Sequence, residues 1–99
     1  MKKLFISQPM RGKSDEEILM EREKMISLVK ENVDDVEVLD TFFQGYDGKN
    51  PLFFLSKSIE FLSQADIAIF APGWENYRGC RIENICCKEY GVEIIEFKE

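Results

Sequence analysis

The chain has 99 residues, of which 44% are hydrophobic and 32% are charged, and its 13 basic and 19 acidic side chains give a formal charge of −6. This length predicts a single domain over residues 1–99, and the composition excludes a disordered tail. The acidic balance argues against binding to a nucleic-acid polymer, and the absence of histidine removes His-ligated metal sites and His-activated nucleophiles.

The first half of the chain predicts two strands and two helices. Residues 4–6 form an apolar run that is typical of a buried strand. The capping box Ser14–Glu17 begins a helix that continues to about residue 30 or 31. Residues 36–39 form the second strand, residues 41–49 a long loop, and Asn50-Pro51 the start of a helix to about residue 64. The expected apolar faces are Ile18, Met25, Leu28 and Val29 in the first helix, and Leu52, Phe53, Leu55, Ile59 and Leu62 in the second.

The second half of the chain continues the alternation. Residues 66–71 predict a third strand that ends at Pro72-Gly73, and a helix over 79–90, closed by Gly91, leads to a last strand over 92–97. Strands that alternate with helices predict a four-stranded parallel sheet in a three-layer α/β sandwich, flavodoxin-like or Rossmann-like. Because such sheets bind ligands at the carboxyl ends of their strands, the loops over 7–13 and 72–80 are candidate binding loops.

The three cysteines, Cys80, Cys86 and Cys87, are odd in number and lack the spacing of a zinc site. This usage is typical of a reducing cytosol, so we expect a cytoplasmic protein with no metal and no cofactor. No apolar run approaches the roughly 20 residues of a membrane span, and the N-terminal apolar run is too short for a signal peptide. We therefore expect no membrane contact.

The loop after the third strand supplies five candidate binding residues, which are Trp74, Tyr77, Arg78, Gly79 and Cys80. The loop leads into a helix N-terminus, which favours an anionic or polar ligand, and its two aromatic side chains can stack on a base or cover a sugar. The alternative is that Trp74 anchors the edge of the core, the glycines serve turns, and Arg78 is solvated. A thiol nucleophile at Cys80 is conceivable because a helix start lowers a thiol pKa, but a small residue at the helix start is favoured.

Glu83 is the candidate catalytic residue. At about 100° per residue it falls on the helix arc that also holds Cys86, Cys87 and Tyr90. A carboxylate on that mostly apolar arc fits a partly desolvated nucleophile or general base that the helix end keeps ionised. It also fits a carboxylate that caps nearby N–H groups or pairs with Arg11 or Arg78. The polar side of the helix is expected to hold Arg81, Asn84 and Lys88.

The loop after the first strand offers a hydroxyl, an amide and a guanidinium at a strand end. Its candidate binding residues are Ser7, Gln8, Pro9, Met10, Arg11 and Gly12. An arginine followed by glycine lets backbone and guanidinium donors approach a phosphate or carboxylate. The loop contains neither a dinucleotide fingerprint nor a P-loop, and the alternative is that Arg11 simply pairs with a surface carboxylate.

These residues, in this order, resemble the nucleoside 2-deoxyribosyltransferase superfamily. One matching segment is Leu4-Phe5-Ile6-Ser7-Gln8-Pro9-Met10-Arg11-Gly12, whose Arg-Gly ending is similar to the branch of deoxynucleoside monophosphate N-glycosidases. The other comprises residues 62–70 with their Ala65-Asp66 pair, followed by Gly79-Cys80-Arg81-Ile82-Glu83. The tract from Trp74 to Gly91 most resembles a small branch that is frequent in bacteria and their phages.

The resemblance implies a function for Glu83. The glutamate would attack C1′ of a deoxynucleoside or its monophosphate, displace the base and form a deoxyribosyl ester, which another base or water resolves. Arg11 and the backbone near Gly79 would face the sugar or 5′-phosphate, with Trp74 and Tyr77 near the base. Since family members complete their sites across subunits, the resemblance also implies a homo-oligomer, in the cytoplasm of a bacterial or phage-infected cell.

Two positions depart from the family pattern. Phe5 stands where active families carry a tyrosine, and Ser58 stands where they carry an acid, while Asp66 matches a family position but can simply hold its strand. These departures support a second hypothesis, a non-catalytic module that binds a nucleotide or nucleotide derivative. A third is a small interaction domain whose exposed aromatic side chains make an oligomer.

Overall fold

A parallel sheet forms the middle layer of the protein. The structure, a computed structural model, describes residues 1–41 and 50–97, and in these residues the sheet has four strands in the order β2-β1-β3-β4. The strands are β1 (Lys2–Ser7), β2 (Val36–Val38), β3 (Ile67–Phe70) and β4 (Glu93–Glu96). In register, Leu4 of β1 lies beside Val38 of β2 and Ile67 of β3. The all-parallel pairing confirms the predicted α/β class.

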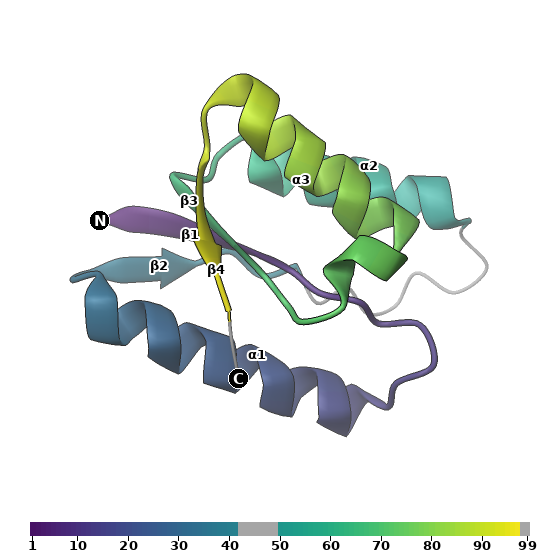
Figure 1. Cartoon of the computed structure of the whole chain (residues 1–99), viewed down its shortest axis with the longest axis horizontal. Coiled ribbons are helices and arrows are strands. Elements are labelled where there is room, and N and C mark those ends of the chain that lie inside the picture. Colours follow the sequence, from purple (N-terminus) through teal and green to yellow (C-terminus); the bar gives the residue numbers. More distant parts are fainter. Residues whose placement is uncertain (42–49, 98–99) are drawn as a thin grey trace.

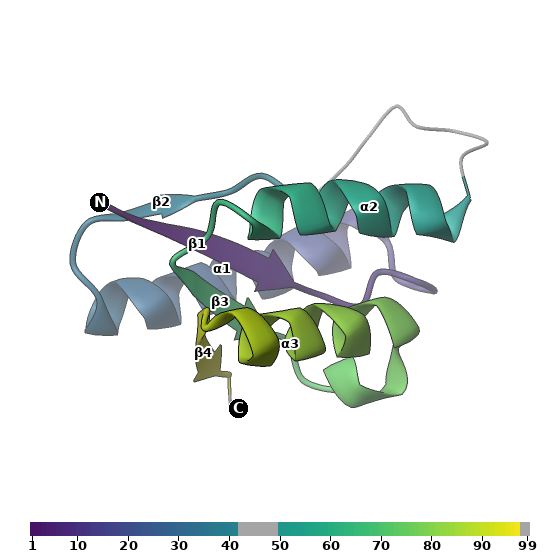
Figure 2. The same cartoon turned by 90° about the horizontal axis from the view of Figure 1, so that it is seen from above.

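Three helices of the described chain cover the two faces of the sheet (Figure 1). Helix α1 (Asp15–Asn32) lies on one face, while α2 (Pro51–Leu62) and α3 (Arg78–Tyr90) lie together on the other, as the view from above also shows (Figure 2). A 3-10 turn, η1 (Trp74–Asn76), joins β3 to α3. The three-layer sandwich is thereby confirmed. Within the described segments, every helix is too short or too polar to cross a membrane.

Local sequence signals fix the helix ends as predicted. The Ser14 hydroxyl accepts a 3.2 Å hydrogen bond from the N–H of Glu17, and the Glu17 carboxylate accepts one of 3.2 Å from the N–H of Ser14. The Asn50 side chain accepts the N–H of Phe53 at 2.9 Å, with Pro51 at the first helical position. At the end of α3, Gly91 has a φ of 75°, the left-handed conformation that glycine adopts most readily.

Two apolar clusters fill the space on either side of the sheet. Alternation along β1 separates them, because Leu4 and Ile6 point towards α1 whereas Phe5 points towards α2 and α3. Each buried side chain of this size contributes about 1.5–3 kcal/mol relative to exposure. The α1-side cluster comprises Leu4, Ile6, Met25, Val29, Ile67, Ile69 and Ala71; the cluster on the other side comprises Phe5, Leu39, Leu62, Ala68, Phe70 and Cys87.

Several element bounds differ from the predicted ones by one or two residues. Helix α1 continues to Asn32, α2 ends at Leu62, and β4 is shorter than predicted, starting at Glu93. Leu52, predicted on the apolar face of α2, is 71% exposed because it lies in the first, outermost turn of the helix. The loop predicted over 41–49 lies outside the described residues, apart from Thr41.

The buried face of α3 also differs from the predicted one. Its buried residues are Cys80, Glu83, Asn84 and Cys87, which follow the spacing i, i+3, i+4 and i+7. Asn84, predicted on the polar side, is 4% exposed, and Tyr90, predicted on the apolar arc, is 85% exposed at the end of the helix. The buried face is therefore centred on Cys80 and Cys87, and Glu83 lies at its border, next to the half-buried Cys86.

Candidate functional site

The two candidate loops begin side by side at one edge of the sheet. Ser7 is the last residue of β1 and lies beside Phe70, the last residue of β3, and the N–H of Ala71 donates to the Ser7 carbonyl at 3.0 Å. From this edge the chain leaves β1 through α1 on one face and leaves β3 through α3 on the other (Figure 1). This is the topological switch point at which open parallel sheets bind their ligands.

A short hydrogen bond joins Ser7 to Glu83 at this edge. The Ser7 hydroxyl donates to Oε1 of Glu83 at 2.6 Å, across 76 residues of sequence. Both side chains are buried, with 1% of Ser7 and 7% of Glu83 exposed. A distance of this size is typical of a hydroxyl that donates to an ionised carboxylate. The bond ties the middle layer of the protein to the first half of α3.

Ser58 of α2 provides a second hydroxyl for the same carboxylate, and both hydrogen bonds lower the pKa of Glu83. Burial is the larger effect and acts in the opposite direction, because it penalises the charged form. The net result raises the pKa of the Glu83 carboxyl from 4.5 to about 7. In the described residues the carboxylate thus meets hydroxyl groups rather than the guanidinium of Arg11 or Arg78.

Two thiols flank Glu83 on its own helix. Burial raises the pKa of the Cys80 thiol to about 11, although Ser7 and Lys13 act in the opposite direction. Burial likewise raises the pKa of Cys87 to about 11, and the nearby Glu83 carboxylate adds to the shift. A thiol held in its neutral form is a poor nucleophile. The structure therefore supports Cys80 as a small buried residue at the start of α3.

The first loop divides into a buried and an exposed part. Gln8 and Pro9 are buried, Met10 is half-buried, and Arg11 and Gly12 are exposed. The Gln8 amide nitrogen donates to the Ile18 carbonyl at 2.8 Å and to the Glu21 carboxylate at 3.0 Å. Ser7 and Gln8 therefore face opposite layers, so this loop presents only Ser7 to Glu83 and turns Gln8 towards α1.

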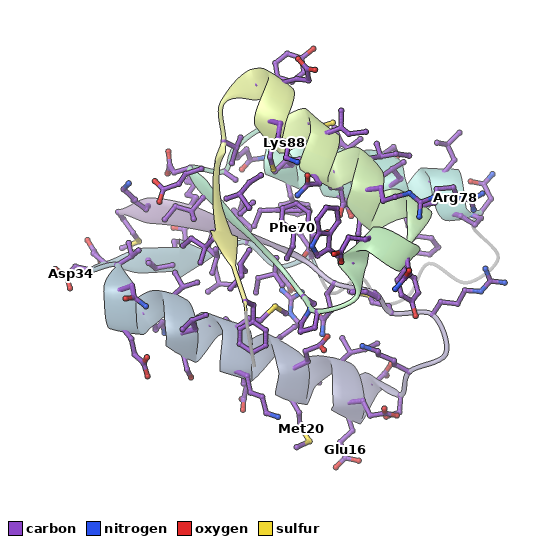
Figure 3. The ribbon with its side chains drawn as sticks, viewed as in Figure 1. Glu16, Met20, Asp34, Phe70, Arg78 and Lys88 are labelled. Carbon is purple, nitrogen blue, oxygen red and sulfur yellow. The ribbon has the colours of Figure 1, made fainter. Side chains whose placement is uncertain are left out.

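The second loop packs one of its aromatic residues on the sheet. The ring of Trp74 lies 5.4 Å from that of Phe70, which is the contact expected of an anchor at the edge of the core. Tyr77 and Gly79 are half-buried, and Tyr77 is the N-cap of α3 without a capping side-chain hydrogen bond. Arg78 is exposed and projects from the N-terminal end of α3 (Figure 3).

A buried arginine was not predicted from the sequence. Arg22 of α1 is 6% exposed and donates to the Thr41 hydroxyl at 3.2 Å, and Thr41 in turn donates to the Ile6 carbonyl at 3.2 Å. Burial lowers the pKa of Arg22, and the carboxylate of Asp40 partly opposes that shift. The spacing 18, 22, 25 and 29 places Arg22 on the buried face of α1, so helical periodicity was a usable signal for this residue.

Two surface hollows lie along α1 rather than beside Glu83. One has a volume of about 560 Å³ and the other about 240 Å³. Met20 lines both hollows and projects away from the sheet (Figure 3). Neither hollow is lined by Ser7, Ser58 or Glu83. Ser7 and Glu83 are buried between the sheet and the α2–α3 layer, and Ser58 is half-buried in α2.

The site offers a carboxylate held by two hydroxyls at the switch point of a parallel sheet. A buried carboxylate with a pKa near neutrality can act as a nucleophile or as a general base. No group of three or more His, Cys, Asp or Glu side chains in the described residues is arranged to hold a metal ion. Comparisons with models of protein families, with curated proteins and with solved structures find no match to this chain.

Proposed function

We propose that the protein cleaves the N-glycosidic bond of a deoxynucleoside or deoxynucleoside monophosphate, or transfers the deoxyribosyl group to another base, with Glu83 as the nucleophile. The observation that carries the proposal is the buried Glu83 carboxylate, bonded to Ser7 at the carboxyl end of β1. The family resemblance of residues 4–12 and 79–83 gives the reaction class. Both segments meet at the edge of the sheet where a ligand is expected.

The proposed reaction divides one displacement into two steps. A bond forms between a Glu83 oxygen and C1′ while the C1′–N bond breaks, and the bonding electron pair leaves with the base, which takes a proton from water. Water or a second base then attacks C1′ and loses a proton to solvent, while the ester bond between C1′ and the Glu83 oxygen breaks and its electron pair restores the carboxylate. The negative oxygen also stabilises the oxocarbenium-like centre of each transition state.

The loops around Glu83 are assigned to substrate binding within the same proposal. The exposed guanidinium of Arg11 would bind the sugar or a 5′-phosphate, aided by the backbone near Gly79 at the start of α3. Tyr77, which is half-buried beside that helix start, would lie near the base. Trp74 would then contribute through its packing on Phe70, which fixes the loop.

The direct experiment is incubation with a panel of deoxynucleosides and their 5′-monophosphates, with free base measured by chromatography. We expect base release, or base exchange when a second base is present. Glu83→Ala should abolish the activity, whereas Glu89→Ala, which removes an exposed carboxylate from the same helix, should keep it. Turnover that persists in Glu83→Ala, or no turnover with any substrate of the panel, would remove the basis of the proposal.

A second candidate function is a non-catalytic module that binds the same nucleotides. Its support is the low exposure of Glu83, at 7%, and a pKa of about 7 that leaves part of the carboxyl protonated at neutral pH. Ser58, in place of an acid, adds to this support. Calorimetry distinguishes the two functions: a binding module takes up the monophosphate without product, keeps its affinity in Glu83→Gln, and loses it in Arg11→Ala.

A further inference from the structure

We propose that Ser7 and Ser58 are positioning residues, whose hydroxyl groups together hold the Glu83 carboxylate in one orientation and favour its ionised form. This inference rests on the proposed function, because it assigns the groups that prepare the nucleophile. It assigns a role to two residues that take no part in the bond-forming and bond-breaking steps. The hydroxyls come from β1 and α2, whereas the carboxylate comes from α3, so three separate elements meet at this point.

The geometry of the Ser7 bond supports the positioning role. Its donor–acceptor distance of 2.6 Å falls in the range of a hydroxyl that donates to a charged oxygen. Ser7 lies at the end of β1, opposite Phe70 of β3, and its carbonyl accepts the N–H of Ala71, so the backbone that carries the hydroxyl is fixed. The hydroxyl on this strand therefore fixes the position of Oε1 of Glu83. A carboxylate has about four acceptor sites on its two oxygens, so a lone pair of Glu83 remains available to attack C1′.

Ser58 completes the arrangement from the neighbouring helix. It is half-buried in α2, which packs against α3, and its hydroxyl lowers the pKa of Glu83. The side chain of Phe5 lies two residues before Ser7 on the same face of β1, but it belongs to the apolar cluster and has no polar group. The hydroxyls on this side of the sheet are thus supplied at positions 7 and 58.

The other groups around Glu83 do not replace the two hydroxyls. On its own helix it faces the thiols of Cys80 and Cys87, which are neutral at physiological pH because burial raises the pKa of both to about 11. The Lys13 ammonium acts on Cys80, and it is held at 3.5 Å from the Glu21 carboxylate. From β1 and α2 Glu83 meets hydroxyls, so within residues 1–41 and 50–97 the charge of its carboxylate is balanced by dipoles rather than by a cation.

Removal of one hydroxyl has a consequence that can be measured without any substrate. Burial already disfavours the charged carboxylate, so loss of a donor raises the pKa of Glu83 further. Because hydrogen bonds to charged groups are the stronger ones, we expect a rise of about one pH unit, which is about a tenfold loss of carboxylate below the midpoint. The acid limb of the activity profile should move to higher pH by the same amount.

The test follows the Glu83 carboxyl by carbon-13 NMR during pH titration of the full chain, in wild type, Ser7→Ala and Ser58→Ala. Ser56→Ala is the matched control, since Ser56 is exposed on the same helix and donates to the Phe53 carbonyl at 2.7 Å. We expect higher midpoints in the first two variants and an unchanged midpoint in the control. Ser7→Thr, which keeps a hydroxyl, should restore the wild-type midpoint.

The possible outcomes separate this inference from the proposed function. An unchanged midpoint in Ser58→Ala and Ser7→Ala, or an equal rise in Ser56→Ala, overturns the positioning role whatever the activity is. If wild type shows no turnover while both midpoints rise, the proposed reaction is wrong and the positioning of Glu83 stands. If Ser7→Ala does not fold, Ser58→Ala at its half-buried helix position decides the matter alone.

Discussion

Lys3 and Asp66 form a reciprocal pair of hydrogen bonds that joins the starts of two neighbouring strands. The backbone N–H of Lys3 donates to the Asp66 carboxylate at 2.8 Å, and the backbone N–H of Asp66 donates to the Lys3 carbonyl at 2.9 Å. These bonds lie at the amino ends of β1 and β3, whereas the Ser7–Glu83 bond lies at the carboxyl ends. The two acids of the family-like segments are therefore separated by the length of the sheet.

We expect Asp66→Ala to lower stability without changing chemistry. It removes a side-chain acceptor for the Lys3 N–H, a loss of about 1 kcal/mol in the free energy of unfolding. Urea unfolding measures this change, and kcat/KM for base release should stay at the wild-type value. Asp34→Ala, at an exposed position, is the control with no expected loss. A large fall in kcat/KM with unchanged stability would place Asp66 in the site after all.

The raised pKa of Glu83 predicts how stability changes with pH. The carboxyl has a pKa of about 7 in the folded protein and an ordinary value of 4.5 in the unfolded chain. Between these values the folded protein keeps a proton that the unfolded chain has released, so a rise in pH favours unfolding. This contribution to stability is fully present below pH 4.5, is lost as pH rises through 7, and is on the order of 3 kcal/mol at 1.36 kcal/mol per pH unit.

Glu83→Gln should remove that pH dependence, because an amide does not titrate. The stability of the variant relative to wild type, measured by urea unfolding at pH 4.5 and pH 8, should increase by a few kcal/mol between the two conditions. Glu89→Gln, at an exposed position of the same helix, should follow the wild-type profile. Parallel profiles for wild type and Glu83→Gln would mean that the carboxyl titrates at its ordinary value.

The order of the elements was predictable from the sequence because each carries a local signal. The capping box at Ser14, the Asn50-Pro51 start and the Gly91 end determine helix limits through bonds within a few residues. The apolar run at 67–70 has no polar residue, which is the pattern of a strand covered on both faces. Fold class follows from the alternation of such elements.

The site was predictable only in part, because its contacts join distant residues. Glu83 stands out on its own helix, but the partner that lies 76 residues away does not follow from any local pattern. The predicted arc of α3 held Cys86, Cys87 and Tyr90, whereas the buried side of the helix includes Asn84 and leaves Tyr90 exposed. Ser58 was identified as a departure from the family, and its contact with Glu83 depends on how α2 and α3 pack.

The buried thiols predict a pattern of chemical modification. With pKa values raised to about 11, Cys80 and Cys87 should react slowly with iodoacetamide at pH 8 in the folded protein, and rapidly after unfolding. Cys86, which is half-buried, serves as the internal reference for reagent access. Mass spectrometry of the labelled peptides measures each rate. Fast labelling of Cys80 in the folded state would return the thiol nucleophile to consideration.

The glycines near the two ends of α3, Gly79 and Gly91, should respond to alanine in opposite ways. Gly91 has a φ of 75°, so Gly91→Ala imposes left-handed strain and should lower the free energy of unfolding by about 1 kcal/mol. An added Cβ at Gly79 meets no atom within 4 Å, so Gly79→Ala should raise stability by up to about 1 kcal/mol. If the backbone at Gly79 approaches the substrate, that stabilised variant should bind deoxynucleoside monophosphates more weakly, whereas Gly91→Ala should keep wild-type affinity. Calorimetry on both variants decides this, and full affinity in Gly79→Ala would remove Gly79 from the binding surface.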